Sequence, residues 1–106
     1  MGLKSEIERS RKMQVITAVF AKGHGFGLVK IQDSQYPTLK RFVDYGMASD
    51  RTANLNVLGL VHDIHPTSEG IEFARQMRDI NSSVRELVDM SNESLIRVLD
   101  QVFRKY

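Results

Sequence analysis

Imidazole and carboxylate groups, which often hold metal ions, come close together at His62, Asp63 and His65 of the 106-residue sequence. Around them the sequence alternates in the pattern of a β-strand, in which consecutive side chains point to opposite faces. We therefore expect His62 and His65 to diverge. Because the chain has no cysteine, thiolate ligands and disulfides are excluded, and no metal centre is expected.

Groups suited to catalysis lack matching partners in the sequence. His24 lies between two glycines with no acid, base or nucleophile nearby, and no Ser/His/Asp or paired-carboxylate arrangement is evident. The segment GHGFGLVK has alternating glycines, but a phosphate-binding loop follows a strand, whereas these glycines follow a predicted helix. We expect neither an enzyme nor a bound cofactor.

Positive charge is concentrated in the first half of the sequence. Residues 1–51 hold nine Lys or Arg against five Asp or Glu, a net charge of +4, whereas residues 52–106 hold six against eight, a net charge of −2. An anionic partner such as a nucleic acid is one interpretation, because phosphate contacts dominate non-specific affinity. An ordinary solvated surface is the other.

Two of these cations, Lys40 and Arg41, lie in a stretch predicted to form a short helix. Ser34 is suited to cap its start, and Pro37 is tolerated in the first turn, where its missing N–H leaves no bond unmade. Gly46 suits the left-handed residue that ends such a helix. The apolar residues that share one face at helical spacing are Leu39, Phe42 and Val43.

After Gly46 the sequence changes to the two-residue period of β-structure. A strand over residues 58–65 is predicted to pair with one near 47–51. The polar segment 52–56 between them favours turns and forms the expected tip of a hairpin, with Arg51 at its base.

A longer helix is predicted near the N-terminus. Ser5 and Glu8 have the spacing of a capping box, and an apolar stripe follows as far as Phe20, before an expected end at Gly23. Residues 26–32 are expected to form a short second element, either a helical turn or a strand.

The order of a short helix, a glycine and a polar hairpin resembles winged helix-turn-helix DNA-binding proteins. The next segment, HPTSEGIEFARQMRD, resembles the Thr-x-x-Gly-x-Glu-Phe helix of a small family of uncharacterised bacterial and phage winged-helix-like proteins, although Pro66 replaces the usual leucine. The matching residues are Gly46, Thr67, Gly70, Glu72 and Phe73. This resemblance spans residues 13–79 and implies an α+β, mostly α, winged helix-turn-helix fold with a C-terminal helical extension.

The resemblance also implies binding to double-stranded DNA, with the short helix in the major groove and the hairpin on its flank. The residues expected to contact DNA are Gln35, Tyr36, Thr38, Lys40, Arg41, Arg51, Asn54 and Asn56. The implied mechanism is promoter occupancy by a transcriptional regulator. A protein-interaction module on the same scaffold is the alternative, because a fold does not fix a function.

Further helices are predicted after the hairpin. Thr67 or Ser68 caps one helix, Ser83 and Glu86 form a capping box after a break near residue 82, and a last helix begins at Ser91 or Asn92. This last helix carries an apolar stripe that either folds back on the core or pairs with a second copy of the chain. We expect a homodimer, because a winged helix already has its own core and the extra stripe needs a partner. The stripe consists of Leu95, Val98, Leu99, Val102 and Phe103.

The length and composition of the chain, 42% hydrophobic and 26% charged, fit a single core. We expect a winged-helix core over residues 1–80 and a C-terminal helical extension over residues 81–106. No apolar run approaches the ~20 residues that cross a bilayer, and no signal-peptide pattern is present, so a cytoplasmic location without membrane contact is predicted.

Overall fold

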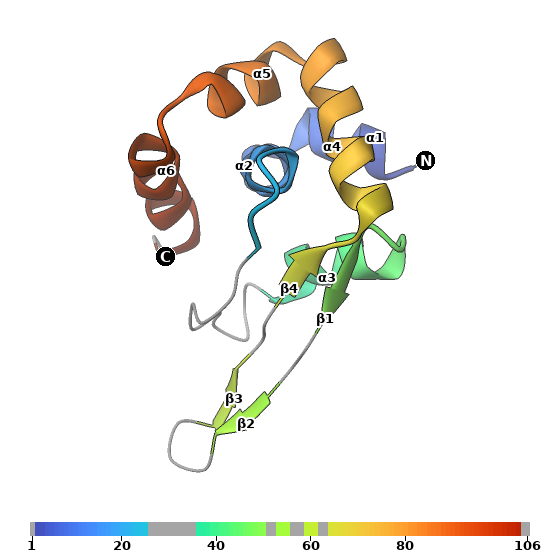
Figure 1. Cartoon of the computed structure of the whole chain (residues 1–106), viewed down its shortest axis with the longest axis vertical. Helices are drawn as coiled ribbons and strands as arrows, with labels where there is room; N and C mark the ends of the chain where they lie inside the picture. The colour runs from blue at the N-terminus through green and yellow to red at the C-terminus, as the bar shows by residue number, and fades with distance from the viewer. Residues whose placement is uncertain (1, 26–35, 51–52, 56–58, 62–63, 105–106) are drawn as a thin grey trace.

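The computed structural model describes residues 2–25, 36–50, 53–55, 59–61 and 64–104, with side chains described at all of these except 36, 53–55, 59–61, 103 and 104. The elements, shown in Figure 1, are α1 (Leu3–Arg9), α2 (Arg11–Ala21), α3 (Tyr36–Asp44), β1 (Ala48–Asp50), β2 (Ala53–Leu55), β3 (Gly59–Val61), β4 (Ile64–Pro66), α4 (Ser68–Ile80), α5 (Ser82–Asp89) and α6 (Asn92–Arg104). The fold is α+β and mostly α, as the sequence predicts. Among the described helices, none combines the length and apolar composition needed to cross a bilayer.

Helix α2 is the centre of the fold, and α1, α3, α4, α5 and α6 all contact it. Figure 1 looks nearly along its axis, with α1, α4, α5 and α6 arranged around it. Every residue from 15 to 21 is buried. The one polar side chain among them, Thr17, donates its hydroxyl to the carbonyl oxygen of Met13 at 2.7 Å. Because the segment 15–21 is buried on every side of the helix, other elements have to cover it on every side, which explains the many neighbours of α2.

The single helix predicted from Ser5 to Gly23 is wrong, because the chain turns at Ser10. Helix α1 begins two residues before Ser5, so Ser5 and Glu8 do not cap its start. Ser10 has an extended backbone, and its hydroxyl oxygen accepts a hydrogen bond from the Met13 N–H at 3.3 Å. Ser10 therefore caps α2 and lets α1 pack against it.

Both glycines predicted to end helices adopt left-handed backbone conformations, with φ of 77° at Gly23 and 75° at Gly46. At the end of α3, the Gly46 N–H bonds to the Val43 carbonyl at 3.0 Å, and the Met47 N–H bonds to the Phe42 carbonyl at 2.8 Å. This pair of bonds is the Schellman arrangement, which satisfies the last carbonyls of the helix.

The strands form a two-part antiparallel hairpin arm that projects away from the helices (Figure 1). Strand β1 pairs with β4 near the helices, and β2 pairs with β3 farther out. The tip predicted at residues 52–56 is misplaced, because pairing continues to Leu55 opposite Gly59. Asn54 consequently lies within β2, opposite Leu60.

Polar side chains cap the helices that follow the arm. The Thr67 hydroxyl accepts from the Gly70 N–H at 3.0 Å, as predicted for the start of α4. The break near residue 82 is confirmed, but Asn81 rather than Ser83 caps α5. Ser91 accepts from the first turn of α6, which also agrees with the prediction.

The C-terminal helices belong to the same core as α2. Val84, Leu87 and Leu95 are buried with the residues of α1, α2 and α3. The predicted boundary at residue 80 therefore divides two parts of one core. Of the apolar stripe on α6, Leu95 is only 3% exposed, and the others with described side chains pack partly buried against the core, namely Val98, Leu99 and Val102. Phe103 is described by its backbone alone. The described part of the stripe thus packs against the chain's own core, whereas we expected it to pair with a second copy.

Candidate nucleic-acid interface

Helix α3 has one buried face and one charged, exposed face. Leu39 and Phe42 are almost completely buried, and the Phe42 ring meets the Phe20 ring edge to face, with 5.3 Å between centroids. Lys40 and Arg41 are exposed. The predicted division of this helix into an apolar face and a cationic face is confirmed.

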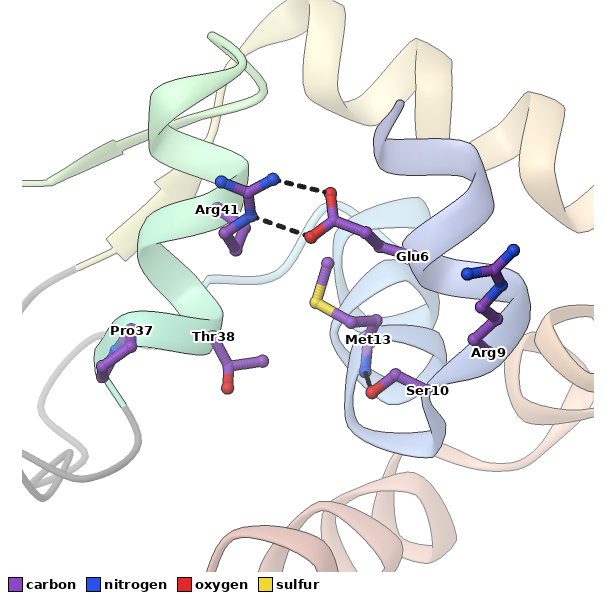
Figure 2. A pocket seen from close by; sticks show the side chains of 7 residues that line it. All are labelled: Glu6, Arg9, Ser10, Met13, Pro37, Thr38 and Arg41. Atoms are coloured by element: carbon purple, nitrogen blue, oxygen red, sulfur yellow. Dashed lines mark hydrogen bonds and ion pairs between the residues drawn. The ribbon is translucent and has the colours of Figure 1, made fainter. Parts of the chain in front are cut away.

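Arg41 is held by a carboxylate from another helix. Figure 2 shows Glu6 of α1 extending to Arg41, whose Nε donates to Glu6 Oε1 at 2.8 Å and whose Nη2 donates to Glu6 Oε2 at 2.9 Å. The guanidinium carbon also lies 5.3 Å from the centroid of the Tyr45 ring. The hydrogen bond to Arg41 holds the pKa of Glu6 below its ordinary value of 4.5, and the same contact raises the pKa of Arg41. Both groups are therefore charged near neutral pH.

An open depression of about 400 Å³ lies between this ion pair and the α1–α2 junction. Arg9, Ser10 and Met13 line it on one side, and Pro37 and Thr38 of α3 line it on the other (Figure 2). Its polar groups are guanidinium and hydroxyl donors, with the Glu6 carboxylate already bonded to Arg41. Such donors can hold an oxyanion.

Several cations outside this region serve as helix caps. Arg75 donates to the carbonyl of Ala21, at the end of α2, at 3.2 Å. Arg85 donates to the carbonyl of Asp79, in the last turn of α4, at 2.7 Å. Lys22 donates to the carbonyl of Met90, which follows α5. Each cation lies where the helix dipole is negative, so these charges are compensated within the fold.

The cations of α1, α3 and the start of α2 have no such partners, apart from Arg41. Within the part of the chain that the structure describes, these side chains make no hydrogen bond or ion pair: Lys4, Arg9, Arg11, Lys12 and Lys40. All five are exposed. Outside this group, Arg97 of α6 is a described cation of the same kind. Within the described residues, the exposed cations without a bonded partner therefore come mainly from α1, the start of α2 and α3.

The structure describes only some of the residues predicted to contact DNA. Thr38, Lys40 and Arg41 lie on α3, with Thr38 half-buried at the depression. Tyr36 begins α3 and Asn54 lies in β2, each described by its backbone. Predicted residues outside the described ranges are Gln35, Arg51 and Asn56.

Sequence reasoning missed Glu6 as the partner of Arg41 and Ser10 as the cap that separates α1 from α2. Glu6 and Arg41 are 35 residues apart, and no local pattern signals such a contact. Ser10 does carry a local signal, since a serine can cap a helix, but the continuous helical pattern around it hides the break.

The candidate metal ligands of the sequence do not form a site in the described part of the chain. His65 lies in β4, whereas His62 and Asp63 fall outside the described residues. Among the residues that are described, no group of three or more His, Asp or Glu side chains is placed to hold a metal ion.

Comparison with models of known protein families, with curated proteins and with solved structures finds no match to this chain.

Proposed function

We propose that the chain is a winged-helix protein that binds double-stranded DNA and acts as a transcriptional regulator by occupying a promoter. The observation that carries this proposal is the distribution of uncompensated cations. They gather on α1, the start of α2 and α3, whereas Lys22, Arg75 and Arg85 neutralise helix ends elsewhere. A cationic surface of this kind attracts the phosphate backbone and orients a protein on it.

The element order supports the same proposal. Helix α3 follows α1 and α2 and precedes an antiparallel arm, and in a winged helix a recognition helix likewise precedes a wing. The short second element predicted at residues 26–32 lies outside the described residues. In this proposal α3 enters the major groove with Lys40 and Thr38, and the arm follows the flanking strand. Tyr36 and Asn54 belong to the same two elements. The other proposed contacts are Gln35, Arg51 and Asn56.

The predicted homodimer is retained in this proposal with a different contact. The buried stripe of α6 is occupied by the chain's own core. The proposed contact of a second copy with α6 is its outer face, where Ile96 is 56% exposed. Light scattering of the wild type and of Ile96→Glu tests this: a dimer converted to a monomer supports it, and a monomeric wild type contradicts it.

DNA binding is tested by fluorescence anisotropy of a labelled mixed-sequence duplex over a series of salt concentrations. The logarithm of the affinity should fall steeply with the logarithm of salt concentration, and Lys40→Ala should lower that slope by about 1. Arg97→Ala is the matched control, because it removes an exposed cation from α6 and should leave the slope unchanged. Absence of binding even at low salt would reject the proposal and leave the protein-interaction module as the alternative.

A further inference from the structure

We infer that Arg41 is a positioning residue that fixes the orientation of α3 through Glu6, and that Lys40 alone of this adjacent pair presents its charge to the bound partner. The inference rests on the proposed function, and it assigns different roles to two neighbouring cations that composition cannot distinguish. It follows from the bonds of Arg41, from the way α3 is attached, and from the place of Arg41 around the helix.

Three of the five N–H donors of Arg41 bond within the chain. Its Nε and one N–H of Nη2 bond to the two oxygens of Glu6. The second N–H of Nη2 is near the Tyr45 hydroxyl, 3.4 Å from the nitrogen. Bidentate recognition of a phosphate uses a pair of parallel donors such as Nε and Nη2, and that edge of the guanidinium is already occupied by a carboxylate. Lys40 has no bonded partner among the described residues.

The attachment of α3 explains why a positioning contact is needed. Its contacts with the core come from one face, with Leu39 and Phe42 buried and Val43 partly buried. A short helix held along one face can still roll about its own axis. Successive residues are separated by about 100° around a helix, so Arg41 lies outside that face. Among the described side chains, the Arg41–Glu6 pair is the one hydrogen-bonded link between α3 and another helix. Because the link lies outside the apolar face, it opposes rolling and sets the direction of Lys40.

The direction in which Glu6→Gln changes DNA affinity distinguishes a positioning role of Arg41 from direct contact with phosphate. Glu6→Gln removes a negative charge from a surface proposed to face a polyanion. If Arg41 itself contacts phosphate, this change leaves binding equal or tighter, because the guanidinium is released and the net charge becomes more positive. If Arg41 positions α3, the same change weakens binding, because the helix loses its lateral restraint.

The experiment measures DNA affinity and salt slope for the full chain and for Glu6→Gln, Arg41→Gln, the double variant and Lys40→Gln. We expect the first three variants to weaken binding to a similar extent, up to about fivefold, the ceiling for an exposed ion pair, without a change in slope. Lys40→Gln should instead lower the slope by about 1. Unchanged or tighter binding by Glu6→Gln, together with a slope lowered by about 1 in Arg41→Gln, would overturn the inference.

Amide hydrogen exchange over residues 36–44 of the same variants separates this inference from the proposed function. If the wild type binds no duplex, the proposed function fails, and exchange alone decides the role of Arg41. Faster exchange of α3 in both single variants, no further increase in the double variant, and recovery in the charge-reversed chain carrying Glu6→Arg and Arg41→Glu support positioning. Exchange that matches the wild type in the single variants rejects it.

Discussion

Replacing Gly70 by alanine tests a close approach in the fold, where the first turn of α4 meets the backbone of Met47 after the end of α3. A Cβ atom at residue 70 would lie 1.7 Å from the backbone oxygen of Met47 and 2.7 Å from its carbonyl carbon. The atoms it meets are backbone, so no side chain can move aside. Ordinary van der Waals contact begins near 3.4 Å, and the two segments would therefore have to separate by more than about an ångström.

The expected loss follows from the bonds that cross this junction. Thr67 donates its backbone N–H to Met47 O at 3.1 Å and its hydroxyl to Gly46 O at 2.8 Å. Losing both destabilises the fold by about 2 kcal/mol, and the steric strain adds about 1–3 kcal/mol. Alanine favours a helix over glycine by about 1 kcal/mol, which offsets part of this. We expect Gly70→Ala to lower the free energy of unfolding by about 2–4 kcal/mol.

Urea denaturation followed by circular dichroism measures this change, with Gly46→Ala as a matched control. Gly46 has a positive φ of 75° but open space around its Cβ position, so its substitution introduces backbone strain of about 1–2 kcal/mol without a clash. Gly70→Ala should therefore be the more destabilising of the two. If Gly70→Ala is neutral or stabilising, as helix propensity alone predicts, the proposed close approach between α4 and Met47 is wrong.

Three further predictions concern caps and charge. Asn81→Ala should lower the free energy of unfolding by about 1 kcal/mol in urea denaturation, because it removes the cap of α5, whereas Ser83→Ala should have little effect. Lys22→Met should speed amide exchange at the start of α6, because Lys22 joins that helix to the end of α5; unchanged exchange would contradict this. The stability difference between the wild type and Glu6→Gln should be complete above pH 4.5 and disappear as pH falls through the lowered pKa of Glu6, since protonation breaks its pairing with Arg41; a difference independent of pH would refute this link.

Helix ends are the part of the fold that sequence reasoning locates well. Gly23 and Gly46 end helices, and Thr67 and Ser91 begin them, as predicted. These features are local, because a capping side chain bonds to a backbone group within three or four residues of itself. The Ser10 break was missed for the opposite reason: residues on both sides of it have helical patterns, and only the packing of α1 on α2 reveals two helices.

Pairing between distant segments could not be derived from local patterns. The predicted hairpin exists, but its strands pair farther out than expected, because alternation defines faces and not the position of a turn. In the candidate interface, the exposure of Lys40 and Arg41 follows from helical spacing. Their different surroundings do not, because Glu6 is brought to Arg41 by the tertiary fold.

Helix α2 is the centre of the fold, whereas the cations Lys40 and Arg41 lie on α3, and this difference bears on function. Because α2 is buried along residues 15–21, it requires neighbours on every side, and α5 and α6 supply some of them. The apolar stripe of α6 is therefore used within the chain, and a second copy is not needed to cover it. Helix α3 instead lies at the edge of the core, and Lys40 on it remains exposed. A peripheral helix with one apolar face on the core and one ion pair to α1 suits a surface that must be both accessible to a partner and held at a defined angle.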